Sequence, residues 1–342
     1  MPIRYFIDLP RRTPKDLPNG RVDFFELDLL QNVRKGQVLA EAYDEPEGFD
    51  PRQFPAGENT YVPQDNPRVL CASVDGHAYW KDGKIHVSPE FVVQGDVDYS
   101  TGNLRFAGRL VVKGTVRAGF IIEAKEALVE GDLEGTALIR GDLEVKGGVV
   151  SGRHKVIVGG DLRAGYVLNS QVEVRGQVEI SKFVRDSRLF SGKEVRVLGQ
   201  PGAILGGEVR ARDAVRAMAF GSRMSSGTKV WVGIDPFLGR FLEEKQGEME
   251  KREEEIQERL QEPDLPIEER LELVREVEEL RFYKELLEEA VFGGEGLIEI
   301  HKEAYQGVTF QIGRESFRLN EDLRGPLRVR LREGKIALER WT

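Results

Sequence analysis

A short motif that recurs through the middle of the chain constrains the fold more than any other feature of the sequence. With Φ for an apolar residue, the motif reads Φ-x-Φ-x-Gly-x-Φ, and nine copies occur between residues 91 and 209. Alternating apolar residues are typical of extended chain with one buried face, and glycine fits a corner where a side chain would be crowded. Each copy therefore predicts a strand, a corner and a second strand.

The glycine of each copy is assigned a structural role at its corner. These corner residues are Gly95, Gly108, Gly114, Gly131, Gly141, Gly147, Gly160, Gly176 and Gly207. In four copies an aspartate follows the glycine: Asp96, Asp132, Asp142 and Asp161. Because a carboxylate at the start of a strand accepts hydrogen bonds from nearby backbone amides, these aspartates are expected to cap the corners.

The spacing of the copies predicts stacked coils. The strands are short, and no segment between them is long enough for a crossover helix. In a parallel β-solenoid each turn of chain pairs with the turns above and below it, and inward Val, Leu and Ile form columns. A β-sandwich would need hairpin dipeptides such as Asn-Gly or Asp-Gly, which residues 91–233 lack. The copies start at irregular intervals, so we predict a right-handed parallel β-helix over residues 91–235 rather than a left-handed one with a six-residue period.

The composition changes abruptly after the last copy. Residues 241–291 hold 19 acidic and 8 basic side chains and a single glycine. Apolar and long side chains recur there with 4-3 spacing, the pattern of a coiled-coil seam, and Pro263 and Pro266 divide the segment into two halves. We expect an antiparallel coiled-coil hairpin of helices over residues 236–292. The candidate interaction residues on this arm are Glu253, Glu254, Glu255, Glu278 and Glu279.

The two ends of the chain have other patterns. Residues 1–90 contain a proline-rich stretch and hairpin dipeptides at Asp75-Gly76 and Asp82-Gly83, which predict a small β-rich domain. After the helical segment the alternation of apolar residues resumes. Residues 293–342 are therefore expected to continue the β-helix or to cap it, covering an otherwise open stack of amides.

Composition also limits the chemistry that the chain can perform. A single cysteine, Cys71, excludes an internal disulfide and a multi-thiolate zinc site, and only four histidines are present. No P-loop, nucleophile-elbow or zinc-protease motif occurs, so we expect no catalytic residues, no metal and no cofactor. The net charge of -9 argues against nucleic-acid binding. The absence of long apolar runs and of a signal-peptide pattern predicts a cytoplasmic chain without membrane insertion.

One stretch of the repeat region resembles a known family. The sequence VSPEFVVQGDVDYSTGNLRFAGRLVVKGTVRAG, residues 87–119, is similar to the flagellar assembly protein A (FapA) family of bacterial β-helix proteins. VRKGQVLA near the start and YQGVTFQIG after the helices extend the similarity over most of the chain. The motif residues that carry it are Asp96, Asp98, Gly102 and Asn103.

The resemblance implies a scaffold without established catalytic residues, linked to flagellar assembly and polar organisation; bactofilins and the C-terminal domain of the division inhibitor MinC are similar solenoids. High Glu and Arg content with few Cys and Met suggests a heat-tolerant bacterium. The leading hypothesis is a non-enzymatic scaffold that binds a protein partner or self-associates into a homo-oligomer through its acidic arm. Two alternatives stay open: a carbohydrate-active or transferase enzyme that uses a groove on the β-helix, and a ligand-sensing regulator.

Overall fold

The structure is a computed structural model, in which the chain divides into two compact units, Met1–Arg175 and Gly176–Thr342, named unit 1 and unit 2 below. The repeat pattern does not indicate this division, which falls inside the range expected to form one β-helix. The structure describes residues 3–7, 15–16, 22–23, 25, 27, 29–43, 49–224, 227–262, 266–292 and 295–341.

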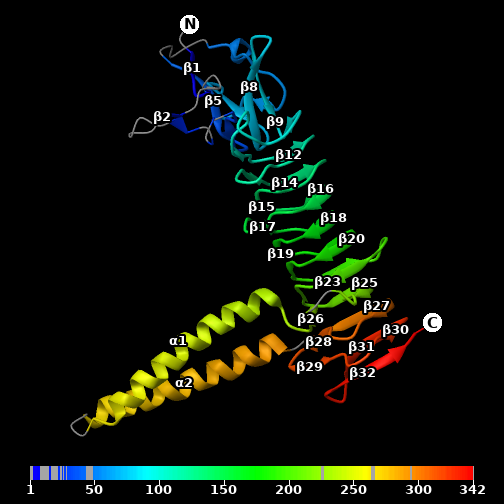
Figure 1. The fold of residues 1–342 in the computed structure, drawn as a ribbon. Coiled ribbons are helices and arrows are strands. Elements are labelled where there is room, and N and C mark those ends of the chain that lie inside the picture. Colours follow the sequence, from blue (N-terminus) through cyan, green and yellow to red (C-terminus); the bar gives the residue numbers. More distant parts are fainter. Residues whose placement is uncertain are drawn as a thin grey trace. The chain divides into compact units, whose positions relative to one another are not determined.

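The repeats of unit 1 form two stacks of parallel strands, drawn from cyan to green in Figure 1. One stack contains β10 (Glu90–Val93), β12 (Arg109–Val112), β14 (Glu126–Val129), β16 (Leu143–Val149) and β18 (Leu162–Leu168). The other contains β11 (Leu104–Arg105), β13 (Ile121–Ala124), β15 (Thr136–Ile139), β17 (Lys155–Val158) and β19 (Gln171–Val174). Each strand pairs in parallel with the next strand of its own stack, which is the pairing of a β-solenoid.

The register of the strands aligns buried side chains in columns. Val112 lies opposite Val129, and Val129 lies opposite Val145; all three are buried. Along most of these strands outward-facing residues alternate with the buried ones, for example Glu123 on β13, Glu144 on β16 and Arg163 on β18. The prediction of a mainly β chain wound as a β-solenoid is therefore confirmed, whereas the right-handed winding stays a prediction.

The solenoid of unit 2 has the same arrangement. One stack contains β20 (Val178–Arg185), β22 (Glu194–Val197), β23 (Ala203–Leu205), β25 (Ala214–Phe220) and β27 (Leu297–Ala304). The other contains β21 (Arg188–Ser191), β24 (Glu208–Ala211), β26 (Lys229–Val232) and β28 (Thr309–Ile312). The first half of β20 pairs with β22 and the second half with β23, so one coil of unit 2 supplies two short strands to the same stack.

The chain changes direction after β28. The remaining strands, β29 (Glu315–Arg318), β30 (Leu323–Arg324), β31 (Leu327–Arg332) and β32 (Lys335–Arg340), pair antiparallel with their neighbours. β29 lies against β28, β31 lies against β27, and β32 covers the free edge of β31. The C-terminal segment thus first continues the coils, through β27 and β28, and then covers the last coil with antiparallel strands.

Two long helices are inserted between the coils of unit 2 (Figure 1). α1 (Pro236–Leu260) follows β26, and α2 (Ile267–Phe292) precedes β27. α1 begins after Asp235, whose Oδ1 accepts the backbone N–H groups of Phe237 at 2.8 Å and Leu238 at 3.3 Å. Because β27 pairs with β25 and β28 with β26, the coils resume as if the helices were absent. In the described part of the chain, no helix combines the length and the apolar character needed to cross a membrane.

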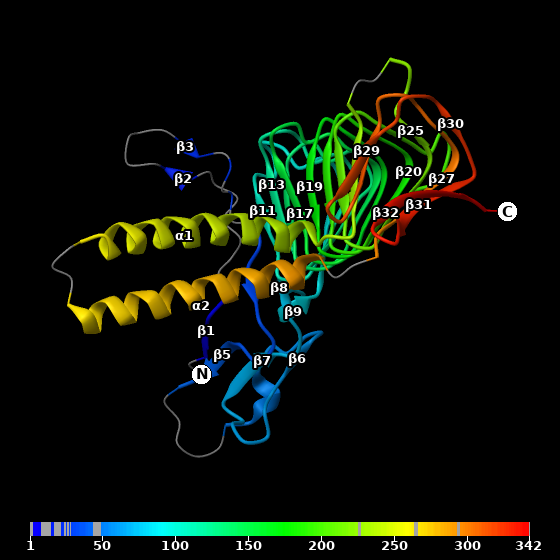
Figure 2. The same ribbon diagram turned by 90° about the horizontal axis from the view of Figure 1, so that it is seen from below.

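The two helices lie side by side, as Figure 2 also shows. Ile256 of α1 packs with Leu273 and Val277 of α2 in a small buried cluster. Ion pairs join Arg252 to Glu276 and Arg259 to Glu269, so residue numbers rise along one helix as they fall along the other. The helices therefore run antiparallel.

The N-terminal part of unit 1 is built from short antiparallel strands. β1 (Ile3–Tyr5), β5 (Val38–Ala42), β7 (Val69–Ala72) and β6 (Thr60–Tyr61) form one sheet, and β4 (Asn32–Val33), β8 (Gly76–Lys81) and β9 (Lys84–Ser88) form another. β2 (Lys15–Asp16) pairs with β3 (Val22–Asp23), and η1 (Pro51–Gln53) is a single 3-10 turn. Val33, Leu39, Leu70, Ile85 and Val87 form the centre of its own small core.

Candidate interaction surfaces

The corner glycines of unit 1 stack directly on one another. The N–H of Gly114 donates to the carbonyl of Gly95 at 3.0 Å, Gly131 donates to Gly114 at 2.9 Å, and Gly147 donates to Gly131 at 3.1 Å. A Cβ atom on Gly131 would lie 2.7 Å from the carbonyl oxygen of Gly114, closer than real Cβ contacts. Gly114, Gly131 and Gly147 therefore need glycine because the adjacent coil passes close by, whereas a Cβ on Gly95 would meet no atom within 4 Å; none of the four has a positive φ.

The other predicted corner residues lie in related positions. Gly160 donates its N–H to the carbonyl of Gly141 at 2.9 Å, and a Cβ on Gly108 would collide with the carbonyl of Pro89. Gly176 accepts a hydrogen bond from the Ser191 hydroxyl at 2.8 Å. Gly207 is different because its φ of +71° lies in the left-handed region that favours glycine.

Three of the corner aspartates bond to the next coil. Oδ1 of Asp96 accepts the N–H of Thr115 at 2.8 Å, Oδ1 of Asp132 accepts that of Gly148 at 2.6 Å, and Oδ1 of Asp142 accepts that of Asp161 at 2.8 Å. Each carboxylate thus satisfies a backbone donor of the adjacent turn of chain. Among the described residues, no group of three or more His, Cys, Asp or Glu is placed to hold a metal ion.

The family-like motif forms the corner that faces the N-terminal strands. The hydrogen bond from Thr115 N–H, and then the guanidinium of Arg117 at 2.8 Å, lower the pKa of the Asp96 carboxyl. Asp98 caps the following turn by accepting the N–H of Ser100 at 2.8 Å. Gly102 occupies a positive φ of +64°, and Asn103 Oδ1 accepts the N–H of Ile121 at 2.9 Å. The motif therefore fixes the first corner of the solenoid.

His77, His86 and Cys71 lie in the N-terminal part of unit 1, where they contact neighbouring rings, backbone or apolar side chains. Tyr79 stands between His77 and His86, with ring centroids 5.8 Å and 5.5 Å away, so the two imidazoles do not face each other across the β8–β9 hairpin. Burial lowers the pKa of His77, whose Nδ1 accepts the N–H of Gln31 at 2.9 Å. Burial also raises the pKa of the Cys71 thiol.

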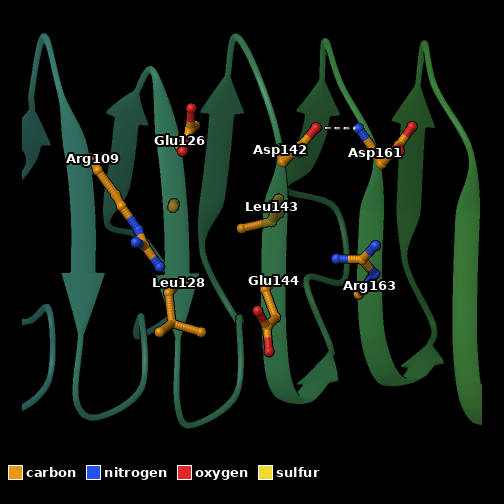
Figure 3. A pocket seen from close by; sticks show the side chains of 9 residues that line it. Arg109, Glu126, Leu128, Asp142, Leu143, Glu144, Asp161 and Arg163 are labelled. Carbon is orange, nitrogen blue, oxygen red and sulfur yellow. Dashed lines mark hydrogen bonds between the residues drawn. The ribbon is translucent and has the colours of Figure 1, made fainter.

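Several hollows lie on the described surface of unit 1, and two of them differ clearly in their lining. The first, of about 230 Å³, opens on the outer face of β12, β14, β16 and β18 (Figure 3). Arg109 lies opposite Glu126 in the strand register, and Glu144 lies opposite Arg163, so charges of both signs line it. The second hollow, of about 500 Å³, separates the N-terminal strands from the first coils. Its lining includes Leu29, His77, Phe91 and Leu104.

A ladder of arginines and glutamates crosses the outer face of unit 2. Glu299 on β27 is only 6% exposed, and its Oε1 accepts a hydrogen bond from Nε of Arg328 on β31 at 2.8 Å. Its Oε2 lies 2.9 Å from Nε of Arg216 on β25. Arg216 also donates to Oε2 of Glu194 on β22 at 2.8 Å. A buried carboxylate needs such partners, and here they tie the antiparallel β31 to the parallel coils.

The other stack of unit 2 carries a surface that we name the basic–aromatic face. It consists of Arg188 and Phe190 on β21, Glu208 and Arg210 on β24, and Lys229 and Trp231 on β26, with Glu208 ion-paired to Arg210. The Arg210 guanidinium lies 3.6 Å from the centroid of the Trp231 ring and 5.3 Å from that of Phe190, in cation–π geometry. Sequence reasoning missed this face. Its members occupy the outward positions of the strands, which the repeat pattern leaves unspecified.

The five candidate glutamates of the arm fall into two groups. Glu253 pairs with Arg281 at 2.8 Å, and Glu255 pairs with Arg252 at 3.2 Å. Glu254, Glu278 and Glu279 are exposed and have no ion-pair partner among the described residues. The hairpin thus neutralises some of its carboxylates internally and presents the others to solvent.

Apolar side chains are also exposed on α2. Leu271 is 66% exposed and Val274 is 44% exposed, whereas Leu273 and Val277 face α1. Because an α-helix turns about 100° per residue, Leu271 lies about 200° around the helix from Leu273. We name Leu271, Glu272, Arg275, Glu278 and Glu279, all exposed, the α2 outer face; sequence reasoning identified only its last two members.

Comparisons with known proteins agree with this architecture. Searches among curated proteins and among solved structures found no match for the chain. A protein-family model described as the Flagellar Assembly Protein A beta solenoid domain matches residues 89–336, a range that spans the coils of both units and the two inserted helices. The parallel pairing, the stacked glycine corners and this match lead to one assignment: the chain belongs to the flagellar assembly protein A (FapA) β-solenoid family.

Proposed function

We propose that the chain is a non-enzymatic scaffold that binds a protein partner or a second copy of itself through the helical arm. The observation that carries this proposal is the exposure of Glu254, Glu278 and Glu279, which have no ion-pair partner among the described residues, on helices inserted between the coils of unit 2. An insertion that leaves the coils in register contributes little to their packing. Its charged surface is therefore available for recognition.

Family membership supports a role in flagellar assembly or in the polar organisation of the cell envelope. In this proposal the chain acts in the cytoplasm, the arm is a coiled coil, and no bound cofactor takes part. The strands before and after the arm pair in register, so both ends of the arm are attached to the coils. A rigid platform of this kind suits the positioning of partners better than the closing of a site over a substrate.

The test compares the full-length parent with a variant that carries Glu254→Lys, Glu278→Lys and Glu279→Lys. Light scattering over a concentration series measures self-association, and affinity capture from a flagellated bacterium measures partner binding. We expect the variant to lose at least one of the two. A matched control places the same charge changes on unit 1, at Glu90, Glu123 and Glu144. A parent that remains monomeric and captures the same proteins as the arm variant contradicts the proposal.

A second candidate function, ligand sensing, is favoured by the hollow between the N-terminal strands and the first coils. Its volume of about 500 Å³ falls within the range of small-molecule sites, and its lining combines apolar residues with His77. The probe is an anilinonaphthalene sulfonate dye. Phe91→Ala should weaken dye binding about tenfold, whereas Glu90→Ala should not. Equal binding by parent and Phe91→Ala contradicts this candidate.

A further inference from the structure

The α2 outer face combines an exposed apolar side chain with an excess of carboxylates. Leu271 leaves 66% of its surface in water, and Glu272, Glu278 and Glu279 around it are exposed, with the single cation Arg275 among them. None of these three glutamates has an ion-pair partner among the described residues. A partner for this face must therefore offer apolar contact area and positive charge together.

The basic–aromatic face of unit 2 offers both. Arg188 and Lys229 are exposed, and Phe190 and Trp231 are half-buried beside them with Arg210 stacked on the Trp231 ring. Aromatic rings and arginines are the side chains that contribute most often to protein interfaces.

The distribution of charge within the chain points to the same pairing. Residues 241–291 have 8 basic and 19 acidic side chains, a net charge of -11, whereas the rest of unit 2 has 20 basic and 14 acidic side chains, a net charge of +6. Two arms of such negative charge repel each other, so direct pairing of arm with arm is unfavourable. An arm and the solenoid of unit 2 attract.

The spacing of the carboxylates on α2 also matches the spacing of the cations on the basic–aromatic face. Glu272 and Glu279 are seven residues apart on α2, which corresponds to about 10.5 Å along a helix. Arg188 lies opposite Glu208, and Glu208 lies opposite Lys229, so the two cations are separated by two strand spacings, about 9.6 Å. One pair of carboxylates can therefore lie over one pair of cations.

From these observations we infer that the α2 outer face binds the basic–aromatic face of a second copy of this chain. Each copy carries both surfaces, and in this inference two copies exchange arms reciprocally, which gives a twofold dimer with two identical contacts. Leu271 then packs near Phe190 and Trp231, while Glu272 and Glu279 pair with Arg188 and Lys229. The inference rests on the proposed function, of which it names the partner.

Complementary charge reversal tests the inference with full-length chains. One variant reverses the face, with Arg188→Glu and Lys229→Glu, and another reverses the arm, with Glu272→Lys and Glu279→Lys. Sedimentation velocity at about 0.05 M and about 0.5 M salt measures the dimer dissociation constant. Each variant alone should dimerise at least tenfold more weakly than the parent, and the parent dimer should weaken at the higher salt concentration.

A mixture of the two variants provides the decisive measurement. The reversed arm then meets a reversed face, and the native arm meets a native face, so the heterodimer should regain the affinity of the parent. The control, Glu258→Lys with Glu262→Lys at the end of α1, changes the same charge at two exposed glutamates away from the contact and should dimerise like the parent. Circular dichroism confirms that each variant is folded.

The outcomes separate this inference from the proposed function. If the parent associates but the face-reversed and arm-reversed variants associate equally well, the inference is wrong and the scaffold proposal stands. If the mixture fails to restore an association that both variants lost, the two surfaces do not meet. A parent that is monomeric at every concentration also overturns the inference, and capture of partners by the arm then decides the scaffold proposal.

Discussion

At the residue scale, the short distance between neighbouring coils determines which residues fit the corners. Gly114 and Gly131 lie one above the other with a backbone hydrogen bond of 2.9 Å between them, which leaves no room for a side chain. Asp96 and Asp132 use the adjacent position to accept a backbone N–H from the next coil. The Gly-Asp dipeptides in the sequence are thus signs of coil stacking rather than of a catalytic or metal-binding site.

Gly131→Ala should destabilise the protein, whereas Gly95→Ala should have little effect. The new Cβ at residue 131 would lie 2.7 Å from a backbone oxygen of Gly114, which cannot rotate away, while at residue 95 no atom lies within 4 Å. Strain of this kind costs about 1–3 kcal/mol. Thermal unfolding by circular dichroism measures the difference, and equal melting temperatures for the two variants would show that coil spacing does not select glycine here.

Asp96→Asn should lower stability in a pH-dependent way. The pKa of Asp96 is depressed by the Thr115 N–H and by Arg117, so its ionised form stabilises the folded state above the unfolded pKa of about 3.9. This stabilisation is lost as the pH falls through the folded pKa. Chemical denaturation should give the full difference from the parent at neutral pH and a shrinking one below about pH 4. A difference that stays constant with pH contradicts the electrostatic account.

At the scale of strands and helices, the sequence predicts the features that follow from the local spacing of apolar residues. Alternation predicted inward apolar columns, to which the buried Val112 belongs, and 4-3 spacing predicted a seam between the helices, where Ile256 and Leu273 pack. It could not predict that β31 runs antiparallel to β27, because strand direction depends on partners distant in sequence. Nor could it identify the basic–aromatic face, since outward residues carry no periodic constraint and their grouping arises only from the register between coils.

Val112→Asp tests the inward assignment against an outward residue. Val112 is fully buried among the columns of unit 1, so a carboxylate there would lose its hydration without a partner and should destabilise the fold by several kcal/mol, roughly 3–5. Glu254→Lys, on an exposed position of α1, should change stability by less than about 0.5 kcal/mol. Urea denaturation of both variants measures this contrast, and similar losses would contradict the inside–outside pattern.

At the scale of the whole molecule, the first coil of unit 1 and the last coil of unit 2 are covered. In unit 1, Asn32 takes the place of a neighbouring strand, since its Nδ2 donates to the carbonyl of Arg105 at 2.7 Å and its Oδ1 accepts the N–H of Ala107 at 2.8 Å. In unit 2, β29 and β31 occupy the free edges of β28 and β27. The edge strand β32 carries charged residues at both ends, Lys335 and Arg340, which discourage further pairing. Covered ends favour closed assemblies over filaments that grow from coil to coil.

A chain that ends at Ile312 tests this role of the C-terminal strands. It lacks β29 to β32, so the backbone N–H and C=O groups along β27 and β28 become available to another copy. We expect its size in light scattering to rise continuously with concentration and elongated particles to form in electron micrographs, whereas the parent reaches a fixed small size. A chain that ends at Arg340 keeps every strand and serves as the control. Filaments formed by the parent itself would show that the antiparallel strands do not limit growth, and circular dichroism verifies that the shortened chain retains its β-structure.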